Sequence, residues 1–96
     1  MTILMTARAR MRLIVTGRVQ GVGFRWAAVA EAQRLGLAGW VRNQAGGGVE
    51  IIAEGDKDGL EKLAGWARQG PRFASVSSVE QEWLEWSGDL AGFEIR

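Results

Sequence analysis

The chain contains no cysteine, no histidine and no tyrosine among its 96 residues. The absence of cysteine excludes disulfides, thiolate nucleophiles and zinc–thiolate sites. The absence of histidine removes the commonest general base and the commonest metal ligand. Any chemistry must therefore use arginine, lysine, carboxylates, hydroxyls, side-chain amides or the backbone N–H groups, and we expect neither a metal site nor a cofactor.

Charge and hydropathy exclude further classes of protein. The formal net charge is +1, which gives no electrostatic argument for binding nucleic acid or an anionic membrane. The longest apolar runs, including "MTILM" at residues 1–5, are a few residues long, whereas a membrane span needs about 20 and a secretory signal needs a longer apolar segment and a cleavage site. We therefore expect a cytoplasmic protein that binds neither membranes nor nucleic acid. We also expect a monomer, although no sequence feature determines the oligomeric state.

The chain has the length of one domain. Residues 1–10 show no regular apolar period, and we expect them to form a loosely held leader before a domain at residues 11–96. Residues 12–17 alternate as in a strand. Apolar side chains at helical spacing, among them Phe24, Ala27, Ala28 and Leu35, predict a helix over residues 24–35 that ends at Gly36.

The second half of the chain adds a hairpin, a helix and two strands. The segment "GWVRNQAGGGVEIIAEG" predicts a hairpin that turns at three consecutive glycines, residues 46–48. A helix is predicted to begin at Asp56 or Asp58, to end before residue 70, and to bury one face made of Leu60, Leu63, Ala64 and Ala67. Residues 74–86 predict a long strand, and residues 92–96 a short one.

This order of elements is β-α-β-β-α-β with one further short strand. It predicts an α+β fold, a ferredoxin-like sandwich in which two helices cover one face of a mostly antiparallel sheet. The five tryptophans are expected to pack in the core or on the faces of the sheet.

The segment "TGRVQGVGFR", residues 16–25, carries the main functional signal. Gly21 and Gly23 allow the chain to turn so that several N–H groups point at one spot beside a helix N-terminus, an arrangement that binds anions. Arg25 lies in the first helical turn, where a cation opposes the helix dipole by about 0.3–1 kcal/mol unless an anion is bound. The alternative is an ordinary turn whose arginine pairs with a surface carboxylate. Neither the G-x-G-x-x-G nor the P-loop nucleotide motif is present.

Asn43 is the only asparagine in the chain and follows the first strand of the predicted hairpin. Its side-chain amide can hold a water molecule in place, because it offers both a donor and an acceptor. The alternative is a local role, in which the side chain bonds to the backbone of its own turn.

The pair "GRVQGVGFR" and "GWVRN" resembles the two signature motifs of the acylphosphatases, which hydrolyse carboxyl-phosphate anhydrides. The resemblance extends from about Met11 to Arg96 and includes "GxVEIxAEG", "RxGPxxAxV" and the final "GFEIR". It implies a ferredoxin-like fold with a five-stranded sheet. It also implies an enzyme that needs no cofactor, binds small acyl phosphates and releases inorganic phosphate.

The resemblance also implies the roles of individual residues. Arg25 corresponds to the arginine that binds phosphate, and Asn43 to the asparagine that orients the attacking water. The phosphate cradle corresponds to the backbone amides of Gln20, Gly21, Val22, Gly23, Phe24 and Arg25. The remaining candidate proton acceptors are the substrate's own phosphate oxygen and a carboxylate such as Glu50 or Glu54.

Two other functions are compatible with the predicted fold. A non-catalytic module could use the same cradle to hold an anion or a partner peptide. RNA-recognition domains share the topology, but this chain lacks their aromatic strand motif and their basic surface.

Overall fold

The computed structural model describes residues 7–96. Its seven elements follow the predicted order, with the short strand at the end of the chain. Their bounds are β1 Arg8–Arg18, α1 Phe24–Arg34, β2 Ala38–Asn43, β3 Val49–Asp56, α2 Lys57–Ala67, β4 Ser75–Leu84 and β5 Phe93–Ile95. No helix in this part of the chain is both long enough and apolar enough to cross a membrane.

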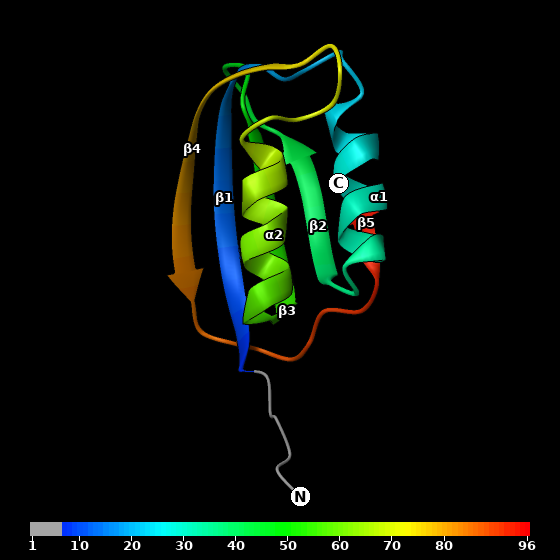
Figure 1. Cartoon of the computed structure of the whole chain (residues 1–96), viewed down its shortest axis with the longest axis vertical. Helices are drawn as coiled ribbons and strands as arrows, with labels where there is room; N and C mark the ends of the chain where they lie inside the picture. Colours follow the sequence, from blue (N-terminus) through cyan, green and yellow to red (C-terminus); the bar gives the residue numbers. More distant parts are fainter. Residues whose placement is uncertain (1–6) are drawn as a thin grey trace, which may run out of the picture.

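The strands form one five-stranded sheet in the order β4-β1-β3-β2-β5. Neighbouring strands are antiparallel except for β2 and β5, which are parallel. Both helices cover the same face of the sheet, α2 over β1 and β3 and α1 over β2 and β5 (Figure 1). The prediction of a ferredoxin-like α+β sandwich is therefore confirmed.

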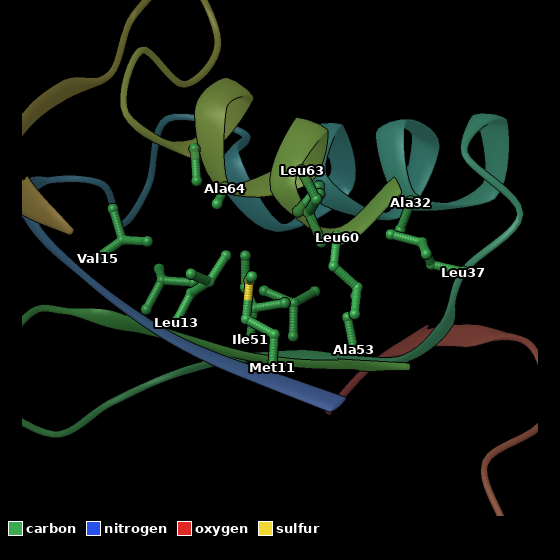
Figure 2. Close-up of a cluster of buried hydrophobic side chains, with 14 of the residues drawn as sticks. Met11, Leu13, Val15, Ala32, Leu37, Ile51, Ala53, Leu60, Leu63 and Ala64 are labelled. Atoms are coloured by element: carbon green, nitrogen blue, oxygen red, sulfur yellow. The ribbon is translucent and has the colours of Figure 1, made fainter. Parts of the chain in front are cut away.

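The hydrophobic core lies between the two helices and the sheet (Figure 2). In β1 the alternate residues Met11, Leu13 and Val15 are at most 1% exposed, because successive side chains of a strand point to opposite faces. Burying each such side chain stabilises the fold by roughly 1.5–3 kcal/mol. The alternation in the sequence thus decides which face of the sheet receives the helices.

The helices bury the faces that their apolar spacing predicts, with small differences. In α2 the buried residues are Leu60, Leu63, Ala64 and Ala67, as expected. In α1 they are Phe24, Ala28 and Ala32. Ala27 and Leu35, also expected on that face, are only half-buried.

Strand β1 begins at Arg8, before the predicted start of the domain. Arg8, Ala9 and Arg10 continue the antiparallel pairing with β3, and the carbonyl of Ala7 accepts the N–H of Lys57 at 2.9 Å. The prediction of a loosely held leader is therefore wrong for residues 8–10, which the long strand β3 holds. Residues 1–6 of that predicted leader lie outside the described residues.

The tryptophans lie mostly outside the core. None of the five is among the buried hydrophobic residues, and Trp26 is 75% exposed. Trp40 lies on the helix-free face of the sheet, with the guanidinium groups of Arg42 and Arg96 at 5.1 and 5.2 Å from its ring centroid. The expected core packing holds only for Trp66, which packs against the core and whose ring centroid lies 5.2 Å from that of Phe24, and the expected packing on a sheet face holds for Trp40.

Two buried carboxylates organise the helix-free face. Glu50 accepts hydrogen bonds from the Nε atoms of Arg12 at 2.6 Å and Arg42 at 2.7 Å. Burial by itself would raise the pKa of Glu50, but these two arginines outweigh burial and hold the pKa below its usual range. Glu50 therefore joins β1, β3 and β2 as a charged, hydrogen-bonded group.

Glu54 performs a similar role at the other end of β3. Its carboxylate accepts hydrogen bonds from the Ser87 N–H and Oγ, both at 2.7 Å, and from the Gly88 N–H at 3.2 Å. Arg10 adds an ion pair at 3.4 Å. Burial by itself would raise the pKa of Glu54, but the hydrogen bonds from Ser87 and Gly88 and the charge of Arg10 outweigh burial and hold the pKa below its usual range. Glu54 thus fixes the connection between β4 and β5 against the sheet.

We expect the free energy of unfolding to decrease in acid because the pKa values of Glu50 and Glu54 are lower in the folded chain. The stabilisation is fully present above the unfolded value of about 4.3. It decreases as the pH falls below that value and through the lowered folded values. Urea unfolding from pH 7 to pH 3 measures this dependence. Glu54→Gln should lower stability at pH 7 by about 1–3 kcal/mol and make the acid dependence shallower, whereas Glu61→Gln on exposed α2 surface should change neither.

Gly17 lies at the point where the register between β1 and β4 shifts. Its φ is +119°, and an added Cβ would lie 2.3 Å from the Ser75 carbonyl oxygen. Gly17→Ala should therefore reduce the free energy of unfolding by about 2–4 kcal/mol, from backbone strain and overpacking. Gly65→Ala is the matched control, because its Cβ meets open space on α2, and it should stabilise the chain by up to about 1 kcal/mol. Equal effects of the two substitutions would contradict this account.

Candidate functional site

The two segments singled out by the sequence lie at the same edge of the sheet. The β1–α1 connection and the C-terminal end of β2 both lie at the upper end of the molecule (Figure 1). They meet there because β1 and β2 each run antiparallel to β3 and so end together. The topology therefore brings the glycine-rich loop and Asn43 to one end of the domain.

The β1–α1 connection presents a row of free backbone donors. Gly21 and Gly23 have φ values of +74° and +80°, and Gly23 is the left-handed N-cap of α1 with no side-chain cap. Within residues 7–96, none of the N–H groups from Gln20 to Arg25 donates to a backbone carbonyl. These N–H groups do not donate to side-chain oxygens either, because the backbone donors to side chains in residues 7–96 are Ser87 and Gly88. Such a run of free donors at a helix N-terminus is an anion-binding arrangement.

Arg25 adds a positive charge to this loop. It is the second residue of α1, whose first turn has no acidic residue. The salt bridges of residues 7–96 do not involve Arg25. The alternative in which Arg25 pairs with a surface carboxylate is therefore not what the structure shows. A half-buried arginine next in sequence to these free amides suits a phosphate or a carboxylate.

Asn43 is the last residue of β2, and its side chain is not satisfied locally. It is paired with Val49, which is buried in the core under the helices. Paired residues of antiparallel strands point the same way, so Asn43 also lies on the face that carries the helices. Its Oδ1 atom is buried and has no hydrogen-bond partner. This overturns the alternative in which that oxygen bonds to its own turn. A buried acceptor without a partner is costly, so this oxygen is available for a water molecule or a ligand.

Open space lies directly beside this side chain. A surface pocket of about 440 Å³ is lined by Arg42, Asn43, Gln44 and Ala45. A pocket of this size falls in the range of small-molecule sites. Asn43 therefore lines an open surface pocket, although the pocket's lining does not include the residues of the β1–α1 loop.

Gln20 is a residue whose side chain the sequence reasoning did not use. Its Nε2 donates to the carbonyls of Gln44 at 2.8 Å and Gly48 at 2.9 Å. These contacts join the β1–α1 loop to the loop that follows Asn43. The sequence offers no signal for them, because the partners are backbone groups 24 and 28 residues away.

The two carboxylates considered as proton acceptors lie elsewhere. Glu50 is paired with Arg42, one residue before Asn43, so its side chain points to the opposite face of the sheet. Glu54 is held by Ser87 at the other end of β3. Both carboxylates are already bonded to the groups that lower their pKa. Within residues 7–96, no group of three or more carboxylates is placed to hold a metal ion.

Comparisons with known proteins identify the family. A family profile described as acylphosphatase matches residues 11–95. The acylphosphatase of Thermococcus kodakarensis is 52% identical over 88 residues, which cover 92% of this chain and 96% of that protein. The acylphosphatase of Pseudomonas aeruginosa is 50% identical over 90 residues, covering 94% and 98%.

A solved structure extends the likeness to three dimensions. The crystal structure of the acylphosphatase from Bacillus subtilis has a TM-score of 0.88 and 38% identity, and covers 92% of this chain and 98% of that one. Profile, sequence and fold agree over nearly the whole length, and the chain belongs to the acylphosphatase family.

Proposed function

We propose that this chain hydrolyses acyl phosphates to a carboxylate and inorganic phosphate by direct attack of a water molecule, without a metal ion. One observation carries the proposal. Among residues 7–96, six N–H groups without a partner and Arg25, which forms no salt bridge, lie at the same edge of the sheet as the buried, unpartnered Oδ1 of Asn43. This proximity supports an anion site next to a water site.

The amides of Gln20 to Arg25 would bind the phosphoryl oxygens. Phosphoryl transfer passes through a loose transition state whose negative charge is spread over the equatorial oxygens. Donors that are already oriented toward that charge stabilise it without reorganisation. Arg25 supplies the compensating positive charge, and its planar fork of donors matches two oxygens at once.

Asn43 would hold the attacking water. Its free acceptor takes a hydrogen bond from the water and leaves a lone pair of the water oxygen directed at phosphorus. As the new P–O bond forms, the bond between phosphorus and the acyl oxygen breaks. The water proton passes to an oxygen of the substrate's own phosphate. This route is supported by the positions of Glu50 and Glu54, whose carboxylates are engaged away from Asn43.

The reaction needs neither a general acid nor histidine. The leaving group is a carboxylate, whose conjugate acid has a pKa of about 4, so it departs without being protonated. This explains how a chain without histidine or cysteine could perform the hydrolysis. The chain acts on small-molecule substrates, and its monomeric state and cytoplasmic location stay predictions.

Steady-state hydrolysis of benzoyl phosphate in the presence of EDTA tests the proposal. We expect wild-type turnover to persist in EDTA. Arg25→Ala should lower kcat/KM by about 10²–10³-fold and raise KM, because Arg25 contacts the phosphate before and during reaction. Asn43→Ala should lower kcat by about 10²-fold with little change in KM, because it removes only the positioned water.

Arg34→Ala is the matched control, because Arg34 lies at the far end of α1 in a surface pair with Glu31. It should retain wild-type kinetics. If the wild type shows no turnover but inorganic phosphate stabilises its fold, the enzymatic function is refuted and the non-catalytic anion-binding module is the better description. Loss of turnover in EDTA that Mg²⁺ restores would refute metal independence.

A further inference from the structure

We propose that the side chain of Gln20 is a positioning residue that holds Asn43 in register with the phosphate cradle. The inference rests on the proposed roles of Asn43 and the cradle. It assigns to Gln20 a function beyond the backbone N–H that it contributes to the cradle.

The hydrogen bonds of Gln20 reach both ends of the β2–β3 loop. The Nε2 atom of Gln20 donates to the carbonyl of Gln44, the residue directly after Asn43, at 2.8 Å. It also donates to the carbonyl of Gly48 at 2.9 Å. Gly48 precedes Val49, the register partner of Asn43. The two protons of one amide group are thus both used, one on the residue that follows Asn43 and one on the residue that precedes its partner Val49.

The loop has little else to hold it. Residues 46–48 are three consecutive glycines, which leave the backbone unusually free. Its own hydrogen bonds are Gln44 N–H to the Gly48 carbonyl at 2.7 Å and Gly47 N–H to the Gln44 carbonyl at 3.3 Å. Among residues 7–96, Gln20 supplies the side-chain hydrogen bonds that this loop receives. The pairing with Val49 sets the face on which Asn43 lies, and Gln20 holds the loop that follows it.

The same residue belongs to the cradle. The backbone N–H of Gln20 is the first of the six free donors, while its side chain fixes the neighbouring loop. Gln20 thereby links the phosphate-binding loop to the loop after Asn43, and this link sets the distance between the bound phosphorus and the water on Asn43. Displacement of a reacting group by about 1 Å reduces a rate by about 10²-fold. Gln20 acts through Asn43, and it does not touch the reacting atoms with its side chain.

Gln20→Met tests this role, because methionine has a similar length and no donor. With benzoyl phosphate, kcat should fall by about 10–100-fold. The inhibition constant of inorganic phosphate should change by less than about threefold, since the cradle amides and Arg25 remain. Gln33→Met on the exposed part of α1 makes the same chemical change and should retain wild-type kinetics. An unchanged kcat in folded Gln20→Met would overturn the inference.

A double-mutant cycle separates positioning from general stabilisation. In the Asn43→Ala background, Gln20→Met should reduce kcat by less than about twofold, because residues that act as one unit are not additive. A full, additive loss would mean that Gln20 does not act through Asn43, and would overturn the inference. Wild-type kcat in Asn43→Ala alone would refute the proposed water site and the inference with it. A defective Asn43→Ala beside a normal Gln20→Met would refute only the inference.

Gln20→Glu provides a test that does not depend on the fold of the methionine variant. An ionised carboxylate cannot donate and would face two carbonyl oxygens, whereas a protonated carboxyl donates one hydrogen bond. The ratio of its kcat to that of the wild type should therefore rise as the pH is lowered from 7 to 5. A ratio independent of pH would contradict the role of Gln20 as a donor.

Discussion

The free N–H groups between β1 and α1 are the constraint on which the proposed site depends. A helix N-terminus leaves donors without partners, and here the preceding loop adds further ones instead of capping them. Gly23 caps α1 with no side chain at all, and Arg25 adds positive charge where a carboxylate would normally stabilise the helix. This arrangement is unfavourable in isolation, and the proposed bound phosphate would offset that local cost.

The sheet keeps this local arrangement from distorting the domain. The core fixes β1 through alternate buried residues on one face, while Glu50 ties the three central strands together on the other. Glu54 performs the same task at the end of the sheet remote from the site. Because the sheet is held on both faces, the β1–α1 loop can keep N–H groups without hydrogen-bond partners. The binding loop therefore needs few internal contacts of its own.

Much of this could be predicted from the sequence, because the signals are local or periodic. Alternation in β1, the helical spacing of Leu60 and Leu63, and the glycines before Phe24 all act over a few residues. The start of β1 could not be predicted, since Arg10 belongs to a strand through its pairing with Glu54 of β3 and Leu84 of β4, both distant in the sequence. The position of Trp40 on the helix-free face depends partly on a distant residue, because Arg96 from the end of the chain packs over its ring together with Arg42 of the same strand. The side chain of Gln20 was missed for the same reason, as its partners are distant backbone carbonyls.

The lengths of the outer strands have a consequence for how the molecules behave in concentrated solution. Strand β5 has only three residues, so one border of the sheet offers little backbone to a second chain. Strand β4 is ten residues long but carries Glu80 and Glu82, and its side chains are mostly exposed and polar. Short or charged borders disfavour strand addition between molecules. The domain thus resists edge-to-edge aggregation without a covering helix.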